Sequence, residues 1–314
     1  MKIALPERTR RFVEQHLPRD ASVAWYSDAA SALTAVEDAQ VAWLDIFPAK
    51  AIGRAVQAGT ALRWVTTSFA GVEEFPLGEL RERGILLTNG AGINAIPVAE
   101  FAVMGMLAAA KNLPAIVRSQ DRREWVKHAP GVLELFESRV LIIGLGHIGR
   151  LIADRLRAFG ADAVGVRRRP YAGETTVLGP NDWQVRLPQF DWVILAAALT
   201  AETRHMIGAG ELARMKPTAW LVNIARGALI DQAALIAAVT RGALAGAFLD
   251  VTDPEPLPAA DPIWTTPNII VTSHCSGRAQ TRMTERAAAL FLDNLDRYRA
   301  SNALRNTVDL ALGY

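Results

Sequence analysis

The sequence has only one cysteine, Cys275, among its 314 residues. A single cysteine excludes an intramolecular disulfide framework and a cysteine-rich zinc site, so a reducing, cytoplasmic setting is expected. The charges also lack an excess of one sign, since 34 basic and 32 acidic residues give a formal net charge of +2. This balance argues against an acidic solvating chain and against a nucleic-acid binder coated with positive charge.

Long apolar runs are missing as well. The longest, such as residues 101–110, fall short of the ~20 residues that a membrane-spanning helix needs, and the first residues lack the apolar core of a signal peptide. No membrane partner is therefore expected. The composition is 51% hydrophobic and 21% charged, which is typical of a folded globular chain. At ~150 residues per domain, the length is enough for about two domains.

Short β-rich runs alternate with helical patterns along the chain. Strands separated by helices indicate βαβ units and parallel sheets, and runs that are apolar on both faces predict strands covered by helices on each side. We therefore expect two α/β domains. The runs are 2–5, 22–26, 41–44, 63–66 and 85–88 in a first series, and 139–143, 162–166, 191–196, 219–224, 244–249 and 268–272 in a second.

Two helical patterns define the expected domain boundaries. The segment 98–113 is apolar, rich in alanine and methionine and of helical length, so we interpret it as a helix that links the domains, with the boundary near Pro97. Residues 279–298 repeat apolar positions at spacings of three and four. We expect this last helix to return to the first domain. The expected domains are 1–96 plus 279–314, which is discontinuous, and 97–278.

The strongest local motif is the glycine pattern GLGHIG at 144–149, which follows an expected strand and opens a helix. In that context the three glycines permit a tight turn, close approach of the backbone to a pyrophosphate, and close helix–strand packing. The N–H groups at the helix start then bind the anion. The alternative is a glycine-rich loop without a ligand. The expected cofactor-binding residues here are Gly144, Gly146, His147, Ile148 and Gly149.

The end of the next strand indicates which dinucleotide binds. NAD-binding domains carry an acidic residue there that accepts hydrogen bonds from the ribose hydroxyls, whereas this chain has Arg167, Arg168 and Arg169. Guanidinium groups bind a 2′-phosphate through charge-assisted, bidentate hydrogen bonds. The sequence therefore predicts NADP(H) in preference to NAD(H). The alternative is a solvated basic turn that tolerates either cofactor.

Three candidate catalytic residues, Arg226, Glu255 and His274, each follow one of the expected strands. Ligand sites of open α/β sheets lie at the carboxyl ends of the strands, so these side chains are expected at one edge. Taken singly, Arg226 could satisfy a carboxylate or a helix end, Glu255 could be a surface acid and His274 a structural histidine. Cys275 is interpreted as a buried small residue, because neighbouring strand-like residues point to opposite faces. No compact ligand spacing predicts a metal site.

Taken together, these motifs resemble the D-isomer-specific 2-hydroxyacid dehydrogenase family. The resemblance covers nearly the whole chain, and it implies two Rossmann- or flavodoxin-like domains with parallel sheets, an active site in the interdomain cleft and a homodimer. Residues 98–131 are the candidate dimer surface. The segments that carry the resemblance are 68–72, 98–100, 144–149, 199–200 with Thr203, 223–227, Asp231, 249–251, 255–256 and His274.

The resemblance implies an oxidoreductase that reduces small 2-oxo acids to D-2-hydroxy acids. Arg226 would bind the substrate carboxylate and 2-oxo oxygen, and His274 would donate a proton to the forming alkoxide. Glu255 would accept the other ring N–H of His274 and so fix its tautomer. Backbone N–H groups of a loop in the first domain would bind the carboxylate. The substrate-binding residues are then Ala70, Gly71 and Val72, and the further cofactor-binding residues are Leu199, Thr203, Ala225 and Asp250.

The chain departs from the family pattern at Ala198 and Ser273, where members often have proline. These departures leave every catalytic group in place but affect loop rigidity and pocket shape. Similarity to NADPH-using members suggests glyoxylate or hydroxypyruvate as the substrate. A phosphoglycerate dehydrogenase is expected less, since the chain ends at Tyr314 without a regulatory domain, and Glu255 replaces the glutamine of formate dehydrogenases. The alternative is a dinucleotide-regulated protein like the C-terminal binding protein corepressors, which share the fold and bind peptides.

Overall fold

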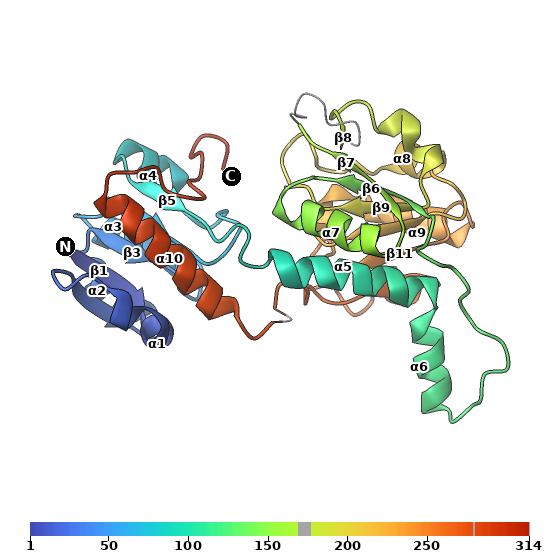
Figure 1. Ribbon diagram of the computed structural model, residues 1–314, viewed down its shortest axis with the longest axis horizontal. Helices are drawn as coiled ribbons and strands as arrows, with labels where there is room; N and C mark the ends of the chain where they lie inside the picture. Colours follow the sequence, from blue (N-terminus) through green and yellow to red (C-terminus); the bar gives the residue numbers. More distant parts are fainter. Residues whose placement is uncertain (169–176, 279, 314) are drawn as a thin grey trace. The chain divides into compact units, whose positions relative to one another are not determined.

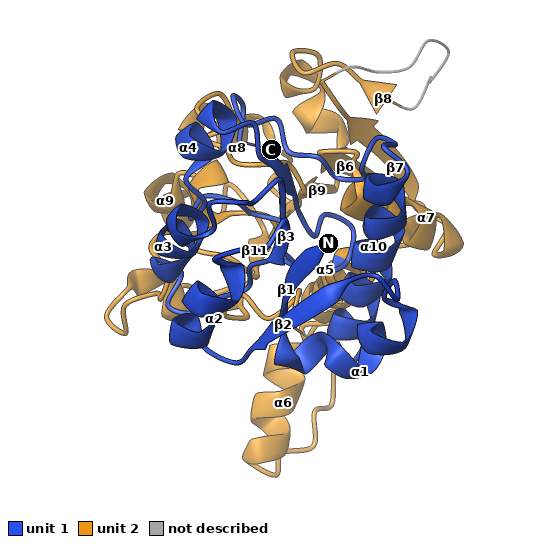
Figure 2. Cartoon of the chain, turned by 90° about the vertical axis from the view of Figure 1, so that its left-hand side faces the viewer, with its two compact units in different colours: residues 1–94, 280–314 blue, residues 95–279 orange. Residues whose placement is uncertain are grey.

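The computed structural model describes residues 1–168, 177–278 and 280–313 (Figure 1). The chain divides into two compact units, which Figure 2 colours separately. Unit 1 is Met1–Asn94 with Gln280–Tyr314, and unit 2 is Ala95–Ala279. Each unit contains one parallel β-sheet with helices on its faces, which confirms the expected α/β class.

The sheet of unit 1 has the strand order β2-β1-β3-β4-β5, and all its strands are parallel. The chain runs outward in one direction from β1 to β2 and in the other from β3 to β5. Ligands of such sheets bind beyond the carboxyl ends of the strands at this switch point, which here lies between β1 and β3. The strands are β1 (Lys2–Pro6), β2 (Ser22–Tyr26), β3 (Val41–Trp43), β4 (Trp64–Thr66) and β5 (Leu86–Thr88).

Helices cover both faces of this sheet. One apolar cluster joins α2 and α3 to the sheet, and a second joins α1 and α10 to the opposite face. The aromatic ring of Phe291 on α10 stacks on Trp64 of β4 with ring centroids 5.5 Å apart. The helix near the C-terminus therefore completes the core of the N-terminal unit. The helices of unit 1 are α1 (Arg10–Val13), α2 (Ala29–Val36), α3 (Ala51–Ala58), α4 (Leu77–Glu82) and α10 (Met283–Arg299).

The sheet of unit 2 has the order β12-β11-β10-β9-β6-β7-β8 and is again parallel. Its central strands are buried along their whole length. Strand β8 was not expected, because two residues are too short to show a periodic pattern. The strands are β6 (Arg139–Ile143), β7 (Asp162–Val166), β8 (Val177–Leu178), β9 (Trp192–Leu195), β10 (Trp220–Asn223), β11 (Gly246–Leu249) and β12 (Ile269–Val271).

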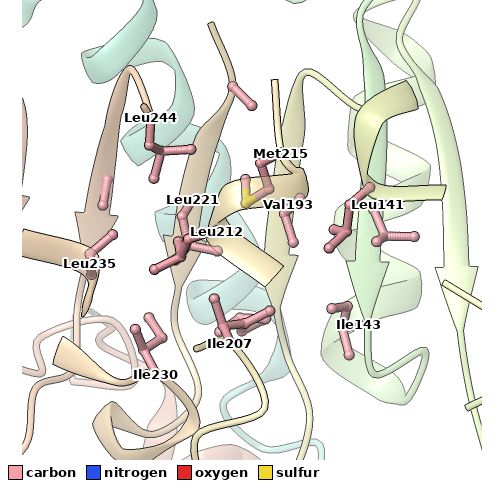
Figure 3. Packing of buried hydrophobic residues seen from close by; sticks show 14 of the residues in the cluster. Leu141, Ile143, Val193, Ile207, Leu212, Met215, Leu221, Ile230, Leu235 and Leu244 are labelled. Atoms are coloured by element: carbon pink, nitrogen blue, oxygen red, sulfur yellow. The ribbon is translucent and has the colours of Figure 1, made fainter. Parts of the chain in front are cut away.

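Two apolar clusters sandwich this second sheet. Helices α5 (Ala95–Ala110) and α7 (His147–Ala158) pack on one face. Helices α8 (Ala209–Arg214) and α9 (Gln232–Thr240) pack on the other, where Leu212 and Leu235 meet leucine and valine side chains of the strands (Figure 3). Helix α6 (Leu113–Asp121) follows α5 after a short break. Burial on both faces explains why the strands read as continuous apolar runs.

The expected start of the linking helix is wrong. Helix α5 begins at Ala95, so Pro97 lies inside it rather than before it. A proline is tolerated in the first turn because the N–H groups there have no intrahelical partner.

No single helix in the described ranges is long and apolar enough to cross a membrane. Helices α5 and α6 are long and apolar enough only when taken together, and they are bent by 69° at the break between them.

Candidate active site

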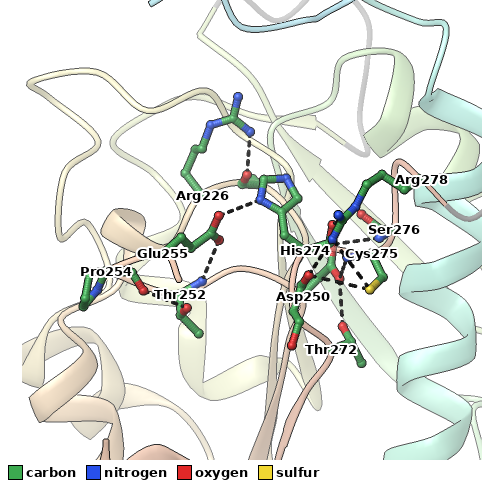
Figure 4. A network of polar contacts seen from close by, with 12 residues as sticks. Arg226, Asp250, Thr252, Pro254, Glu255, Thr272, His274, Cys275, Ser276 and Arg278 are labelled. Atoms are coloured by element: carbon green, nitrogen blue, oxygen red, sulfur yellow. Dashed lines mark hydrogen bonds and ion pairs between the residues drawn. The ribbon is translucent and has the colours of Figure 1, made fainter. Parts of the chain in front are cut away.

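Three loops follow neighbouring strands at the carboxyl edge of the unit 2 sheet. Strands β10, β11 and β12 are adjacent and parallel, so their carboxyl ends lie along the same edge. Arg226 follows β10, Glu255 follows β11 and His274 follows β12. Figure 4 shows the three side chains in one corner of this edge. The fold thus brings together residues that are far apart in the sequence.

His274 and Glu255 are in direct contact. The ring Nδ1 of His274 lies 2.7 Å from Oε2 of Glu255. The second carboxylate oxygen of Glu255 accepts a hydrogen bond from the backbone N–H of Thr252 at 3.1 Å, and this fixes the carboxylate plane. A carboxylate on Nδ1 keeps a proton on that nitrogen, so Nε2 is the ring atom left to exchange a proton with another molecule.

The backbone of the His274 loop is held in an uncommon conformation. Ser273 and His274 have φ values of 54° and 53°, in the left-handed region that non-glycine residues rarely adopt. Such residues cost about 1 kcal/mol or more and persist where surrounding contacts over-determine them. The backbone N–H of His274 donates to the carbonyl of Asp250 at 2.5 Å.

The buried carboxylate of Asp250 supplies further contacts to this loop. It accepts hydrogen bonds from Oγ1 of Thr272 and the backbone N–H of Cys275, both at 2.8 Å, and from the N–H of Ser276 at 3.1 Å. Asp250, expected from the sequence as a cofactor-binding residue, thus organises the histidine loop in this structure.

Sequence reasoning missed Arg278 as a second support of this loop. Its Nη2 donates to the carbonyl of Ser273 at 2.9 Å, and its Nε donates to the carbonyl of His274 at 3.1 Å. These bonds span five residues or fewer, but the sequence pattern offers no signal for a side chain that turns back onto its own loop. Donors from Arg278 and acceptors from Asp250 thus clamp the backbone of His274 from both ends.

The interpretation of Cys275 as a buried, strand-like residue is wrong. Strand β12 ends at Val271, and the left-handed backbone of the two residues before Cys275 replaces the alternation of a strand. Cys275 is partly exposed. Its sulfur donates to the carbonyl of Ser273 at 3.6 Å.

Arg226 is positioned by a buried amide. The Asn223 side chain, fully buried at the end of β10, donates to the carbonyl of Arg226 at 2.9 Å and accepts from the N–H of Ala225 at 3.1 Å. The guanidinium of Arg226 donates to the carbonyl of Ala225 at 2.8 Å. Both expected residues of this loop, Arg226 and Ala225, are half-buried. Asn223 was noted in the family pattern, but its role as the support of the loop emerges only from the structure.

The glycine turn between β6 and α7 fits a dinucleotide pyrophosphate. Gly144 has a φ of 105°, and a Cβ there would lie 2.5 Å from the backbone of Ala196. A Cβ on Gly149 would collide with the carbonyl oxygen of Gly144. A Cβ on Gly146 would meet nothing within 4 Å, so this glycine leaves open space at the start of α7. The first N–H groups of a helix bind anions in such a space.

The remaining turn residues border the same open space. His147 is exposed and Ile148 is half-buried, and both belong to the first turn of α7.

The arginines after β7 lie at the sheet edge next to this turn. The backbone N–H of Arg167 donates to the carbonyl of Leu178 on β8 at 3.2 Å. Arg168 forms an exposed ion pair with Glu202 at 2.9 Å, a kind of contact that contributes little stability and exchanges readily. Arg169 lies outside the described residues.

The loop after β9 carries two more expected cofactor-binding residues. Oγ1 of Thr203 donates to the carbonyl of Ala198 at 2.8 Å and accepts from the N–H of Thr200 at 2.7 Å. Leu199 packs against the apolar cluster beneath the sheet. The threonine side chain thus closes the turn that contains Ala198 and Thr200.

The expected substrate loop, Ala70 to Val72, follows β4 in unit 1. The carbonyl of Ala70 accepts a hydrogen bond from the Asn89 side chain at 2.8 Å, and Val72 is buried. Gly71 is half-buried. The loop is therefore held at both of its ends by contacts within unit 1.

No group of three or more His, Cys, Asp or Glu side chains that could hold a metal ion occurs in the part of the chain that the structure describes.

Comparisons with known proteins show which family the chain resembles. A family model described as "D-isomer specific 2-hydroxyacid dehydrogenase, NAD binding domain" matches residues 103–276. A glyoxylate reductase of Korarchaeum cryptofilum is 30% identical over 318 residues, which is 97% of this chain and 93% of that protein.

Two further similarities concern a longer protein and a solved structure. A D-3-phosphoglycerate dehydrogenase of Methanocaldococcus jannaschii is 32% identical over 81% of this chain, and the match spans 49% of that protein. The solved structure is that of an NADPH-dependent glyoxylate/hydroxypyruvate reductase from Sinorhizobium meliloti in complex with NADP and malonate. It superposes with a TM-score of 0.77 at 26% identity, covering 99% of this chain and 98% of that one.

Proposed function

The chain belongs to the D-isomer specific 2-hydroxyacid dehydrogenase family, and on that premise we propose that it reduces small 2-oxo acids to D-2-hydroxy acids with NADP(H) as the reductant. Glyoxylate and hydroxypyruvate are the first substrates to examine, because a similar protein from Korarchaeum cryptofilum is named a glyoxylate reductase and one from Sinorhizobium meliloti a glyoxylate/hydroxypyruvate reductase. The enzyme is accordingly assigned as a nicotinamide-dinucleotide-dependent 2-oxo acid reductase.

The dinucleotide is assigned to the edge of unit 2 formed by the glycine turn and the β7 end. Gly144, Gly146 and Gly149 shape the pyrophosphate turn, with His147 and Ile148 in the first turn of the helix. When bound, the reduced nicotinamide supplies the hydride equivalent for the carbonyl carbon. Leu199, Thr203, Ala225 and Asp250 are proposed to contact the same cofactor.

His274 is proposed to supply the proton. Its Nδ1 is held by Glu255 at 2.7 Å, so its Nε2 donates to the carbonyl oxygen of the substrate as that oxygen gains negative charge. In the reverse direction the same nitrogen accepts the hydroxyl proton. Glu255 keeps the ring in one orientation and stabilises the positive charge that His274 carries as the acid.

Arg226 is proposed to anchor the substrate. A guanidinium offers several donors in one plane, which suits a carboxylate and the neighbouring 2-oxo oxygen. It polarises the carbonyl and orients its carbon for reaction. The backbone N–H groups of Ala70, Gly71 and Val72 are assigned to the carboxylate as well.

NADP(H) preference is assigned to the arginines after β7. Arg167 and Arg168 lie at the strand end where an acidic residue would select NAD, and their charge favours a 2′-phosphate. The exposed Arg168–Glu202 pair gives way because a phosphate offers two charges and more acceptor oxygens than the carboxylate.

We also propose that the protein is a homodimer that uses α6 and the segment after it. Several large apolar side chains are exposed there, and an exposed apolar patch of this kind marks an interaction surface. The exposed residues are Leu113, Ile116, Val117, Trp125, Val126, Val132, Leu133 and Phe136.

The proposed reaction rests on one observation, the contact between His274 and Glu255. This contact lies beside Arg226 at the carboxyl edge of the unit 2 sheet (Figure 4). Steady-state assays of the purified protein with NADPH or NADH, and with glyoxylate or hydroxypyruvate, test it. We expect turnover with both acids and a kcat/KM for NADPH at least tenfold above that for NADH. Equal efficiency with both cofactors would refute the assignment of the arginines, and no turnover of any 2-oxo acid would refute the reaction.

A further inference from the structure

An ion pair joins two loops at the edge of unit 2 to which the dinucleotide is assigned. Arg168 lies in the loop after β7, and Glu202 lies in the loop after β9. Strand β6 separates these two strands in the sheet, and the glycine turn follows β6. The guanidinium of Arg168 donates to Oε2 of Glu202 at 2.9 Å. The pair therefore connects the loops that flank the glycine turn on its two sides.

The ends of both flanking strands contact this turn directly. The backbone N–H groups of Gly144 and Leu145 each donate to the carbonyl of Val166 on β7 at 3.0 Å. On the other side, a Cβ on Gly144 would lie 2.5 Å from the backbone of Ala196, which follows β9. The turn is thus bordered on one side by the chain that leads to Arg168 and on the other by the chain that leads to Glu202.

Glu202 stands on a closed turn of the backbone. The N–H groups of Thr203 and Arg204 donate to the carbonyl of Thr200 at 3.2 and 3.0 Å. The hydroxyl of Thr203 closes the same turn through its bond to the carbonyl of Ala198. The side chain of Glu202 is 79% exposed, so its substitution changes the charge beside Arg168 without disturbing a core.

The carboxylate of Glu202 and a 2′-phosphate are competing acceptors for the guanidinium of Arg168. A guanidinium binds either anion through charge-assisted hydrogen bonds, and the donors engaged by one are not available to the other. A phosphate that approaches Arg168 is also repelled by the negative charge of Glu202. Glu202 therefore opposes a dinucleotide that carries the 2′-phosphate more than one that carries a 2′-hydroxyl.

We propose that Glu202 is a specificity-determining residue that limits the preference for NADPH, because it holds Arg168 until a 2′-phosphate takes its place. This inference rests on the proposed function, since it takes Arg168 to bind that phosphate. Glu202 acts through Arg168 and is therefore a positioning residue of the cofactor site. Because an exposed ion pair contributes little stability, its loss is expected to change the affinity for NADPH by about two- to fivefold.

The test measures the dissociation constants of NADPH and NADH by fluorescence titration, so it does not depend on turnover. Glu202→Gln retains the size of the side chain and removes its charge. We expect it to lower the Kd of NADPH about two- to fivefold and to leave the Kd of NADH unchanged. In an Arg168→Ala background the same substitution should leave the Kd of NADPH unchanged as well, because the residue through which it acts is gone.

Asp162→Asn is the matched control for the loss of one negative charge. Asp162 forms an exposed ion pair with Arg139 at 3.5 Å, and it lies at the opposite, amino end of β7. Its substitution does not touch the edge assigned to the cofactor, so it should change neither dissociation constant. A general effect of net charge on the binding of anions would appear in Asp162→Asn and Glu202→Gln alike.

The outcomes separate this inference from the cofactor preference on which it rests. If Arg168→Ala removes a preference of the wild type for NADPH but Glu202→Gln changes neither constant, the role of Glu202 is refuted and the assigned preference stands. Equal tightening of NADPH and NADH in Glu202→Gln also refutes it, because the carboxylate would then act on the whole dinucleotide. If the wild type and Glu202→Gln each bind both dinucleotides equally well, both proposals fall.

Discussion

Glu255 is the residue whose chemistry depends most on its charge. Its contact with Nδ1 of His274 holds the ring in one orientation, and an amide in its place retains the size but not the charge. We expect Glu255→Gln to lower kcat about ten- to 100-fold, since a charged partner contributes more to a histidine acid than a neutral one. Steady-state kinetics with glyoxylate and NADPH measure this.

Glu285→Gln provides the matched control for that substitution. Glu285 pairs with Arg282 at the exposed start of α10, and an exposed pair of this kind contributes about 0–1 kcal/mol. Its kcat should equal that of the wild type. A Glu255→Gln enzyme with kcat within twofold of the wild type would show that the contact is structural.

At the scale of residues, the three candidate catalytic residues could be predicted from the sequence, but the side chains that hold their loops in place could not. Arg226, Glu255 and His274 lie in the loops that follow three neighbouring strands, so topology predicts that they meet at one edge of the sheet. Asp250 follows an apolar strand, and the partners of its carboxylate in the 272–276 loop come more than 20 positions later. No local pattern marks such a pairing, because a hydrogen bond across a sheet edge depends on which strands are neighbours.

At the scale of elements, two glycines of the turn between β6 and α7 serve different functions. Gly149 allows close packing against the backbone of Gly144, and Gly146 leaves open space at the start of the helix. Gly149→Ala forces a methyl group against the carbonyl of Gly144, so we expect a loss of about 2 kcal/mol or more in unfolding free energy. Gly146→Ala meets open space, so its stability should match that of the wild type within about 0.5 kcal/mol. Its methyl group occupies the space assigned to the pyrophosphate.

The KM for NADPH is therefore expected to rise about tenfold or more in Gly146→Ala, with folding intact. Urea unfolding and cofactor titration of the two variants, side by side, measure the difference. An unchanged KM for NADPH in Gly146→Ala would contradict the placement of the cofactor at this turn.

The carboxylate of Asp191, just before β9, accepts hydrogen bonds from Arg139 and Lys216. These contacts make the unfolding free energy of the protein depend on pH. Burial raises the pKa of Asp191, but hydrogen bonds from the backbone of Arg139 and from Lys216 outweigh it and hold this pKa below its ordinary value of 3.8. A lowered pKa means that the stabilisation is present above pH 3.8 and is lost as the pH falls through the lowered value.

We expect Asp191→Asn to lower the unfolding free energy by about 1 kcal/mol at pH 7, where the wild type retains both contacts. The difference between the two proteins should shrink below pH 3.8. Urea unfolding at pH 7 and under increasingly acidic conditions measures it. A difference that stays constant or grows on acidification would contradict the assigned direction.

The sequence predicted the bounds of some strands correctly, but it missed one strand and misplaced the start of one helix. Strands such as β2, β6 and β7 have the bounds expected from the sequence, because they are apolar runs that end at turn residues. Within the described residues, strand β8 pairs with Gly165 and Val166 of β7, and two residues are too few to show a periodic pattern. The start of α5 was misplaced because Pro97 reads as a helix boundary, although the first turn of a helix accommodates proline.

At the scale of the whole molecule, the return of α10 to the first unit was expected from topology, because the second sheet is complete at β12 without another strand. The proposed dimer belongs to this scale. Trp125 is 94% exposed and Val132 is 75% exposed, and burying side chains of this size contributes about 1.5–3 kcal/mol each. The double substitution Trp125→Glu with Val132→Glu is expected to convert a dimer into a monomer.

Light scattering after gel filtration measures this change in mass. Leu312→Glu is the control, because Leu312 is also exposed but lies near the C-terminus. Its mass should remain that of a dimer. A wild type that is monomeric at micromolar concentration, or a double variant that stays dimeric, would contradict the proposed surface.

The measurement that tests the account most directly is the kcat of His274→Gln for the NADPH-dependent reduction of glyoxylate, with NADPH affinity and unfolding free energy measured on the same preparation. Glutamine preserves polarity and much of the volume but cannot act as a general acid. The account predicts a fall of about 10²–10⁴ in kcat with unchanged cofactor affinity and stability. A kcat within a few-fold of the wild type would show that the proton comes from another group.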